Sequence, residues 1–585
     1  MRAHDRSLPR PPARPGARWW LVGAMACGGC DEGARPSDAA RPRVNVVLRG
    51  RFEVTERFSD GRDAVTVVGD CNGDDRIDLV NGATLQVQGE PGRFAASPLP
   101  AATGRKVGTM TDLDGDGAVD LVLVGADVVW LPGDGACHFG EPRTLADPTP
   151  GEPAQVLVHD VDRDGLTDLT VARQERRDVA LQLLVARGDG RFDDRAPPPT
   201  PRPNHLDRPF RTFGTFYDDV DGDGALDLFA SLDDDLGWVA WGTAPGALTF
   251  APDLAATTIF SAVSPMSLSP IDHDRDGVFD YFVSGTFGNH LLLHHEGQRV
   301  FRDVAPEAGV SVPGSRDDGW GSVALDVNLD GYTDLLVREE PDDHQGPGPV
   351  RLLINRHDGT FSRAPASVLD EVLKGTSLAC ADVEADGRVS CFARDTTTRG
   401  LVYLRNRLEP EGRWVGLRLQ GTVSSPDASG ARVTLDGVAP PAVAMVGGQS
   451  PSDGEHDRGV ILALGGASTA SVTVDWPSGI RQRVSGLAPG RYTRVVEPRV
   501  LTLSSRVARA DGAARVEITV MPALAGAAAV ALECVGACAW DGPAVTDAGG
   551  AVRRALRAPT VPGEARVEVR LEGVALRVRP RVRFE

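Results

Sequence analysis

Asp219-Val220-Asp221-Gly222-Asp223-Gly224-Ala225-Leu226-Asp227-Leu228 is the stretch that decides the fold of this 585-residue chain. It places side-chain oxygens at positions 1, 3, 5 and 9 and a glycine at position 6. Calcium prefers about six to eight hard oxygen ligands, and a tight loop must turn sharply to aim several carboxylates inward. Glycine at position 6 permits that turn, so the stretch has the pattern of a calcium-binding loop.

The same pattern recurs along the chain. Related ten-residue loops begin at Asp70, Asp112, Asp160, Asp272, Asp326 and Asp382, so that seven loops follow one another at intervals of 42 to 59 residues. A unit of about 50 residues with four strand-sized segments is typical of a β-propeller blade, and seven blades lie within the usual range. Closure into a ring also hides the strand edges that an open array would expose. We therefore predict an all-β chain with a seven-bladed propeller over residues 44–406.

The ligand positions of the seven loops define a set of metal-binding residues. They are Asp70, Asn72, Asp74 and Asp78; Asp112, Asp114, Asp116 and Asp120; Asp160, Asp162, Asp164 and Asp168; Asp219, Asp221, Asp223 and Asp227; Asp272, Asp274, Asp276 and Asp280; Asp326, Asn328, Asp330 and Asp334; and Asp382, Glu384 and Asp386. An EF-hand closes instead with a glutamate at position 12 between two helices. A single acidic loop would be read as a solvated turn, but repetition at blade spacing predicts about six or seven structural Ca²⁺ sites.

Two of the seven loops depart from the pattern. The first has Asp75 where glycine is expected, so we expect a strained turn and a lower affinity. The seventh has Ser390 at position 9, which removes one carboxylate ligand and leaves metal binding there open. Cys380 and Cys391 bracket this loop, and a disulfide between them could replace a weakened metal site.

The charge of the chain follows from the same loops. The formal net charge is −20, which argues against nucleic acid because phosphate binding needs a basic surface. Of the 28 residues at the four ligand positions, 25 are Asp or Glu. The acidity is therefore assigned to ion binding. The 67 glycines and 43 prolines are typical of many short strands joined by turns.

The N-terminus has the pattern of an export signal. Basic residues precede a short apolar run from Trp19 to Ala26, so we expect residues 1–30 to be a signal peptide and 31–43 a linker. Ala24-Met25-Ala26-Cys27 resembles a bacterial lipobox, in which Cys27 is lipidated; an ordinary cleaved signal is the alternative. We expect the chain in the bacterial cell envelope or secreted, with any membrane attachment through lipid, because no later segment has about 18 consecutive apolar residues. Cys27 and Cys30 also form a CxxC pair, which lacks the strand, helix and second pair of a redox or zinc motif.

The other cysteines are even in number, as expected in an oxidising compartment. Besides Cys380 with Cys391, we expect Cys534 to bridge to Cys538 within one turn. Cys71 with Cys137 is left by elimination, and nothing else in the sequence supports that pair.

Several segments carry a resemblance to known families. The acidic repeats over residues 44–406 resemble the FG-GAP and VCBS repeats of integrin α chains and many secreted bacterial proteins. Within them, three segments resemble the subset that carries a C-terminal ASPIC/UnbV domain: Gly319-Trp320-Gly321-Ser322-Val323-Ala324-Leu325, Leu352-Leu353-Ile354-Asn355 and Phe301-Arg302-Asp303-Val304-Ala305-Pro306-Glu307-Ala308-Gly309-Val310. Trp414-Val415-Gly416-Leu417, Asp427-Ala428-Ser429-Gly430, Gly447-Gly448-Gln449-Ser450 and Val474-Asp475-Trp476-Pro477-Ser478-Gly479 resemble an ASPIC/UnbV domain, here at residues 407–498. The resemblance implies a calcium-dependent propeller followed by a small β-domain, an architecture similar to cartilage acidic protein and its bacterial relatives.

Residues 499–585 differ in character from the repeats. Segments such as Ala514-Arg515-Val516-Glu517-Ile518-Thr519-Val520 alternate polar and apolar residues, which is typical of half-buried strands. We expect a second small β-sandwich there.

No catalytic motif stands out. Ser450 and Ser478 lie in turns without the strand-turn-helix context of a nucleophile, and His290, His294 and His295 do not match a metal-binding pattern such as H-E-x-x-H. We therefore expect a non-catalytic, calcium-binding surface protein that binds an extracellular protein or glycan. The alternative is an envelope enzyme, or an enzyme-associated carbohydrate-binding protein, that uses the propeller as scaffold.

One long connection is the first place to look for a ligand surface. Residues 197–203 are proline-rich and are followed by Arg208-Pro209-Phe210-Arg211-Thr212-Phe213, and arginines interleaved with aromatics can anchor an interface. The alternative is a stiff surface loop with Phe210 and Phe213 packed inward.

Overall fold

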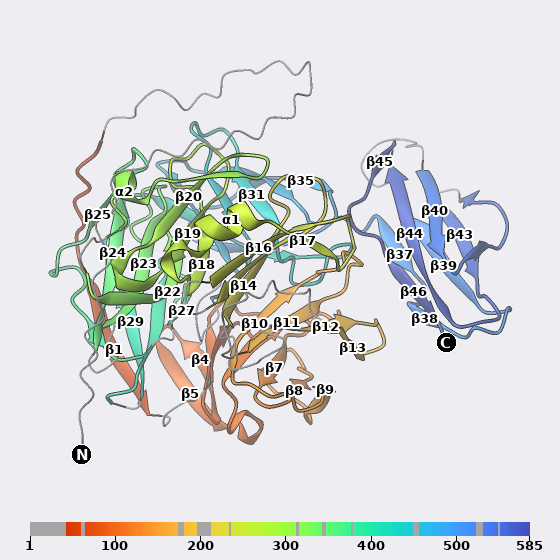
Figure 1. The fold of residues 1–585 in the computed structure, drawn as a ribbon, viewed down its shortest axis with the longest axis horizontal. Helices are drawn as coiled ribbons and strands as arrows, with labels where there is room; N and C mark the ends of the chain where they lie inside the picture. Colours follow the sequence, from red (N-terminus) through yellow and green to blue (C-terminus); the bar gives the residue numbers. More distant parts are fainter. Residues whose placement is uncertain are drawn as a thin grey trace. The chain divides into compact units, whose positions relative to one another are not determined.

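The computed structural model describes residues 43–585 except 60–64, 174–180, 196–211, 233–235, 312–314, 342–346, 376–377, 399, 448–455, 522–529, 548–549 and 572 (Figure 1). About 50% of the chain is strand and 4% is helix, which confirms the predicted all-β, propeller-like fold.

Over residues 52–406, the described chain forms seven antiparallel sheets, six of four strands and one of five. The first strands are β2 (Thr66–Gly69), β6 (Val107–Thr111), β10 (Pro153–His159), β14 (Thr212–Asp218), β18 (Ser267–Ile271), β22 (Asp317–Leu325) and β27 (Leu378–Ala381). The second strands are β3 (Asp78–Asn81), β7 (Asp120–Val124), β11 (Asp168–Arg173), β15 (Asp227–Leu232), β19 (Asp280–Ser284), β23 (Asp334–Pro341) and β28 (Ser390–Asp395).

The third and fourth strands complete each sheet. The third strands are β4 (Thr84–Glu90), β8 (Val128–Leu131), β12 (Leu181–Ala186), β16 (Leu236–Gly242), β20 (Leu291–Gly297), β24 (Gly348–Asn355) and β29 (Gly400–Asn406). The fourth are β5 (Arg93–Pro98), β9 (Arg143–Ala146), β13 (Phe192–Arg195), β17 (Phe250–Pro252), β21 (Val300–Asp303), β25 (Phe361–Arg363) and β1 (Phe52–Ser59), and β26 (Val372–Leu373) pairs with β24. Short helices occupy connections: η1 (Pro100–Ala102), α1 (Leu254–Phe260), η2 (Ser261–Val263), η3 (Thr286–Gly288) and α2 (Ala305–Ala308).

The sheets close into a ring. Each first strand contacts the first strand of the next sheet, from β2 through β6, β10, β14, β18 and β22 to β27, and β27 contacts β2. The last sheet takes its fourth strand from the beginning of the chain, because β1 pairs antiparallel with β29 from Phe52 opposite Asn406 to Ser59 opposite Gly400 (Figure 1). This pairing joins segments about 350 residues apart and leaves no open sheet at the ends of the array.

The fourth strands are more exposed than the inner strands. Every residue of β6 and β7 is buried, whereas β5 is exposed at five of its six positions. Inner strands pack on both faces against neighbouring sheets, so they are apolar runs rather than alternating sequences. The large side chains of Trp130 and Trp238 are fully buried between sheets.

Two further pairs of sheets follow the ring. The first pair contains β33 (Val460–Gly465), β30 (Arg413–Gln420) and β36 (Tyr492–Val496), and β32 (Val443–Met445), β31 (Arg432–Leu435), β34 (Ala470–Asp475) and β35 (Arg481–Leu487). The second contains β37 (Leu501–Leu503), β39 (Arg515–Val520), β43 (Val552–Arg557), β41 (Ala539–Trp540) and β42 (Val545–Thr546), and β38 (Val507–Ala508), β46 (Arg581–Phe584), β44 (Gly563–Leu571), β40 (Val530–Gly536) and β45 (Val574–Ala575). Alternating burial in β39 matches the alternating sequence there. One hydrophobic cluster runs through both pairs, from Val415 to Phe584.

Three disulfides are present in the described chain. Cys380–Cys391 joins β27 to β28 across the seventh loop, and Cys534–Cys538 spans four residues. Cys71–Cys137 joins the first loop to the turn after β8 in the next sheet. The sequence offered this last pair only by elimination, because its partners are 66 residues apart and share no local motif.

Candidate metal centre

All seven acidic loops occupy the same place in their sheets. Each joins the first strand to the second, and position 9 is the first residue of the second strand, from Asp78 in β3 to Ser390 in β28. Because successive strands are antiparallel, these loops and the turns between third and fourth strands share one end of the ring, which we call the acidic end. The second-to-third turns and the connections from one sheet to the next lie at the opposite end.

The loops are folded by hydrogen bonds from their own backbone. In the fourth loop, Asp219 accepts the Gly224 N–H at 3.1 Å, Asp221 the Asp223 N–H at 3.1 Å and Asp223 the Ala225 N–H at 2.7 Å. These contacts turn the carboxylates toward the inside of the loop. The chain reverses through two residues with left-handed backbone, at positions 4 and 6.

Glycine was expected only at position 6. There the left-handed conformation is adopted by glycine in six loops and by Asp75, with φ of 67°, in the first. A non-glycine residue is strained in this conformation, as expected for the first loop. Position 4 is left-handed as well, and non-glycine residues adopt that conformation in four loops: Arg163, Arg275, Leu329 and Ala385. The sequence gives no sign of this second requirement, because residues of different kinds occupy the position.

The residue at position 9 joins the loop to the third strand through hydrogen bonds. Asp227 accepts the Val220 N–H at 3.0 Å with Oδ2 and the Gly242 N–H at 2.9 Å with Oδ1, so it ties the loop to the end of the third strand. Equivalent pairs of bonds are made by Asp78, Asp120, Asp168 and Asp334. In the seventh loop Ser390 accepts the Asn406 N–H at 3.0 Å, so the serine keeps part of this function without a charge.

The second, third and fourth loops have geometry that fits a cation. In each, three carboxylate oxygens lie within 4.8 Å of one another: those of Asp112, Asp114 and Asp120, of Asp160, Asp162 and Asp168, and of Asp219, Asp221 and Asp223. Two buried oxygens at position 3, Asp162 Oδ1 and Asn328 Oδ1, have no hydrogen-bond partner among the described residues. A buried oxygen without a partner is costly, and a cation at the loop would satisfy it.

Electrostatics agree with this geometry. Burial raises the pKa of position-1 carboxyls, and repulsion from neighbouring carboxylates adds to it: Asp112 to about 6, Asp272 to about 8 and Asp326 to about 8. Burial and the same repulsion hold the pKa of Asp160 and Asp168 well above the ordinary value. Negative charge is therefore unfavourable in these loops until positive charge is supplied, and an all-oxygen set of this kind suits calcium.

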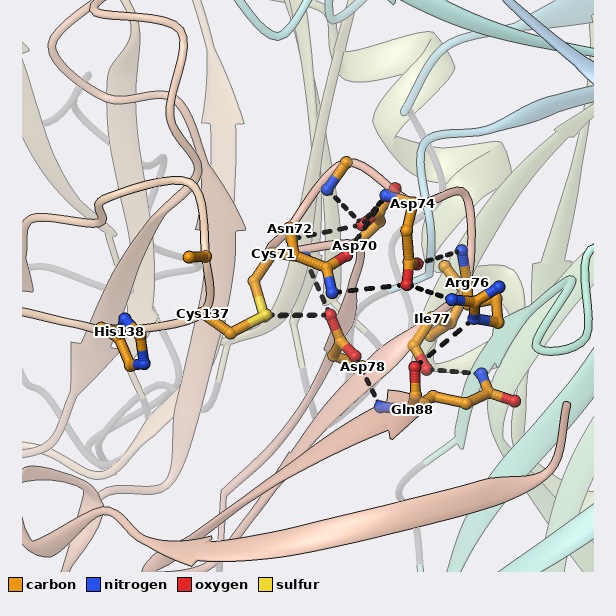
Figure 2. Close-up of a disulfide and its surroundings, with 12 residues drawn as sticks. Asp70, Cys71, Asn72, Asp74, Arg76, Ile77, Asp78, Gln88, Cys137 and His138 are labelled. Atoms are coloured by element: carbon orange, nitrogen blue, oxygen red, sulfur yellow. Dashed lines mark hydrogen bonds and ion pairs between the residues drawn. A yellow bond between two sulfur atoms is a disulfide. The ribbon is translucent and has the colours of Figure 1, made fainter. Parts of the chain in front are cut away.

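In four loops arginines supply part of that charge. In the first loop Asp74 pairs with Arg76 at 2.6 Å, and Figure 2 shows Asp74 turned toward Arg76, close to the Cys71–Cys137 disulfide. In the seventh, Asp386 pairs with Arg388 and Glu384 with Arg405. In the fourth, Asp221 pairs with Arg299 at 2.6 Å.

The third loop is held by arginines from the last two sheets. Arg581 in β46 lies 2.8 Å from Asp162 Oδ2 and 2.9 Å from Asp164 Oδ2, and its side chain is 4% exposed. Arg566 in β44 is 3.5 Å from Asp162, and Arg506 donates to the Asp164 carbonyl at 2.8 Å. The three arginines are about 340 to 420 residues from the loop in sequence and carry no motif, so sequence reasoning missed them.

Other loops at the acidic end also contact the C-terminal sheets. Arg577 pairs with Asp219 at 2.9 Å, the Tyr492 hydroxyl donates to Asp382 at 3.1 Å, and the Glu411 N–H donates to the Asn328 carbonyl at 2.7 Å. Beside the fourth loop, Arg432 binds both oxygens of Asp218 at 2.8 Å. The acidic end is therefore an internal junction between the ring and the sheets that follow it.

Two family models match at these features. The model for the FG-GAP-like repeat matches residues 112–171, 219–283 and 326–392, and each of these ranges contains two of the acidic loops, from the second to the seventh. The model for ASPIC and UnbV matches residues 421–501, over β31 to β36. The chain carries FG-GAP-like repeats followed by an ASPIC/UnbV domain. This order confirms the resemblance, and the relation to cartilage acidic protein stays a prediction.

FG-GAP-like repeats with an ASPIC/UnbV domain indicate a binding-type protein of the cell surface or extracellular space. No curated protein sequence matches this chain. Among solved structures, BBS1N in complex with ARL6DN, soaked with mercury, is similar at 12% identity and a TM-score of 0.35, over 62% of this chain and 99% of that one. A mutant of AofleA from Arthrobotrys oligospora is similar at 10% identity and a TM-score of 0.30, over 56% of this chain and 90% of that one. At these TM-scores the similarities carry no inference about function.

The remaining candidate residues have structural surroundings. Ser478 is buried and donates to Glu497 at 2.5 Å, and the same carboxylate accepts N–H groups of Thr422, Val423 and Ser424 at 2.8 Å. Ser478 thus helps to fold the ASPIC/UnbV domain. Phe213 is buried with its ring 5.3 Å from that of Trp320, as the inward-packing alternative expected.

The three histidines do not form one site. His290 lies 3.4 Å from Glu339 in the neighbouring sheet, and His295 contacts the Gln298 carbonyl at 2.7 Å. His294 faces the fifth loop, 3.0 Å from Asp280.

Some predictions fall outside the described residues: the signal and linker with Cys27, the connection 197–210 and Ser450. Within the described part of the chain, none of the helices has the length and hydropathy needed to cross a membrane.

Proposed function

We propose that this chain is a calcium-binding, non-catalytic protein of the cell surface or extracellular space, whose propeller binds an extracellular protein or glycan. The observation that carries the proposal is the repetition of one buried, mutually repelling carboxylate loop at the same end of successive sheets. Repetition at every sheet is expected of a structural ion and is not expected of a catalytic group, which is needed once.

Calcium would bind most tightly at the second and sixth loops. There the carboxylates at positions 1, 3 and 5, with Asn328 at position 3 of the sixth, supply hard oxygens, and position 9 fixes the loop to the third strand. When bound, the ion supplies positive charge to groups whose burial disfavours ionisation. In the first, third, fourth and seventh loops, arginines already pair with the carboxylates, which lowers the benefit of binding, so we expect weaker sites there.

The ligand surface is proposed at the end of the ring opposite the acidic loops. The acidic end is occupied by contacts from the ASPIC/UnbV domain and the terminal sheets, including Arg577, Arg581 and Tyr492. The opposite end carries the second-to-third turns and the sheet-to-sheet connections, and propellers use such connections for recognition because the scaffold holds them rigidly. Strands β13 and β14, which flank the connection 197–210, end and begin there.

Phe287 is the clearest described anchor at that end. It lies in η3 between β19 and β20, its backbone is left-handed with φ of 56°, and it is 51% exposed. Its N–H donates to Asp318 at 2.9 Å, which fixes the turn to the next sheet. An exposed aromatic ring on a fixed backbone costs little entropy to bury, which is typical of binding hot spots.

The test uses glycan arrays and immobilised extracellular matrix proteins, with a hydrolase substrate panel in parallel. We expect binding that is lost in EDTA and in Phe287→Ser, without turnover. Val300→Ser is the matched control, because Val300 is equally exposed, at 54%, at the acidic end. Turnover of a panel substrate would replace the proposal with the enzyme alternative, and equal loss of binding in both variants would remove the assignment of the surface.

Export and lipidation complete the proposal. Residues 1–30 would direct export, and Cys27 would carry the lipid that holds the protein in the bacterial envelope. Mass spectrometry of the N-terminal peptide from the native host distinguishes a lipidated Cys27 from an ordinary cleaved end, and an intact Met1 would contradict both.

A further inference from the structure

The fifth loop differs from the other six in two histidines. At position 2 it has His273, where the other loops have Cys71, Leu113, Val161, Val220, Val327 and Val383. It also has His294 in its third strand, where the next residue, His295, donates its N–H to Asp280 at position 9. The equivalent residues elsewhere are Val87, Pro132, Val185, Trp241, Ile354 and Arg405. Ten of these twelve comparison residues are aliphatic or aromatic, so both histidines replace side chains that pack.

Both imidazoles point at one carboxylate. Nδ1 of His273 contacts Oδ2 of Asp280, and Nδ1 of His294 lies 3.0 Å from Oδ1 of the same residue. The two rings are 5.4 Å apart at 75°. The two nitrogens and a carboxylate oxygen all lie within 4.8 Å of one another. Three side chains from β19, β20 and the loop before β19 therefore converge on one point.

The cluster is buried but accessible from one side. The side chains of Asp280 and His273 are 0% and 8% exposed, whereas that of His294 is 18% exposed. An ion could therefore enter beside His294 and keep one position open to water, as zinc does at sites with three protein ligands.

Surrounding hydrogen bonds hold the ligands in place. Oδ1 of Asp280 also accepts the His295 N–H at 2.8 Å, and Asn355 in the next sheet donates to the His273 carbonyl at 2.8 Å. In the first four loops and the sixth, Oδ2 of position 9 accepts the N–H of position 2, whereas in the fifth it contacts an imidazole. Such outer contacts orient metal ligands and are typical of built sites.

The donor set selects a different ion from that of the other loops. Calcium takes oxygen ligands, whereas imidazole nitrogen with a carboxylate suits zinc and its neighbours in the first transition series. In the fifth loop both oxygens of Asp280 contact imidazole nitrogens, so nitrogen donors stand beside the carboxylate that closes the loop. We propose that His273, Asp280 and His294 form a transition-metal site of the Zn²⁺ class in the fifth sheet. The metal would replace the contacts between Asp280 and the imidazoles and would tie β18, β19 and β20 together.

The test is a titration of metal-depleted, tag-free protein with Co²⁺, whose visible absorption reports its ligands, in about 1 mM calcium, a concentration that fills extracellular-type oxygen sites. We expect one Co²⁺ per chain, with visible absorption of low coordination number, displaced by one equivalent of Zn²⁺. Elemental analysis after dialysis gives an independent stoichiometry. His273→Leu and His294→Val introduce the residues that the second and third loops carry at these positions. Each should weaken Co²⁺ binding by about tenfold or more.

His138→Ala is the matched control. His138 also pairs with an aspartate, Asp134 at 2.9 Å, but it is 81% exposed and lies in another sheet, so its substitution should leave Co²⁺ binding unchanged. The stabilisation of each variant by calcium is measured alongside, because the proposed calcium sites lie in other loops. A variant that loses Co²⁺ and keeps its response to calcium is folded and supports the site.

Three results would overturn the proposal. They are Co²⁺ binding below one equivalent in the parent protein, Co²⁺ binding by both histidine variants as tight as that of the parent, and displacement of Co²⁺ by the calcium in the buffer. Loss of the calcium response in the parent protein would count against calcium in the other loops and would leave the histidine site standing.

Discussion

Replacement of Asp114 by alanine tests one calcium site without damage to the fold. Asp114 is at position 3 of the second loop, where its carboxylate lies within 4.8 Å of those of Asp112 and Asp120. The residue is exposed, and its one described hydrogen bond within the loop accepts the Asp116 N–H at 3.2 Å. Without calcium the substitution should therefore cost no more than about 0.5 kcal/mol.

The size of the calcium effect follows from linkage. At a dissociation constant of ~0.1 mM, typical of extracellular modules, and ~1 mM free calcium, one site stabilises the folded state by RT ln 11, or ~1.4 kcal/mol. The second and sixth loops together would add ~3 kcal/mol, a large part of the whole stability of an ordinary domain. Asp114→Ala should remove one such share, ~1.4 kcal/mol, in calcium only.

The assay is urea unfolding followed by tryptophan fluorescence, in ~1 mM calcium and in excess EDTA. Trp130 and Trp238 are each 1% exposed in the second and fourth sheets, so their emission changes as these sheets open. Asp134→Ala is the control, because Asp134 is an exposed carboxylate in the same sheet that accepts N–H groups in a turn outside the loop. Asp134→Ala should lower the free energy of unfolding by the same small amount in calcium and in EDTA.

Two results would refute the reasoning. If the parent protein unfolds at the same urea concentration in calcium and in EDTA, the loops do not bind structural calcium. If Asp114→Ala costs as much in EDTA as in calcium, the side chain acts in the loop without an ion, and the second loop is not a site.

Three further predictions concern contacts that hold the ring and its C-terminal sheets. Arg581→Met leaves Asp162 and Asp164 buried without the guanidinium that lies 2.8 and 2.9 Å from them, and should lower the free energy of unfolding in urea by about 3–5 kcal/mol. The control Arg553→Met, at a half-exposed arginine, should cost about 0.5 kcal/mol or less. A cost under about 1 kcal/mol for Arg581→Met would show that Arg581 does not hold the third loop. Gly117→Ala and Gly387→Ala occupy the same position 6 with φ of 92° and 86°, but an added Cβ meets open space at Gly117 and lies 2.5 Å from the Trp414 ring at Gly387. Both should lose about 1 kcal/mol to the left-handed backbone and only Gly387→Ala a further 1–3 kcal/mol, so equal losses would contradict the packing against Trp414. Cys71→Ser with Cys137→Ser opens a loop closed over 66 residues and should cost about 4 kcal/mol, and alkylation of both thiols without prior reduction would show that the bond is not formed.

The sequence by itself determined the repeating parts of this protein. Position 6 glycine, the aspartates at positions 1, 3, 5 and 9, and the apolar runs beside them are local features, and a ten-residue loop folds largely through its own backbone, as the bonds within the Asp219 loop show. Cys380–Cys391 belongs with them, because its partners face each other across one hairpin. The period of the loops then fixed the fold class, since one blade cannot bury both faces of its sheet without neighbours.

Tertiary structure decided what lies between the repeats. The pairing of β1 with β29 closes the ring, and Arg581 approaches Asp162. Both contacts join residues more than 300 positions apart, and no sequence pattern near either partner predicts them. The convergence of His273 and His294 on Asp280 depends likewise on the pairing of β19 with β20. The physical reason is that a local pattern specifies which face of a strand is buried, whereas the charge partner of a buried carboxylate is set by the surface that packs against it.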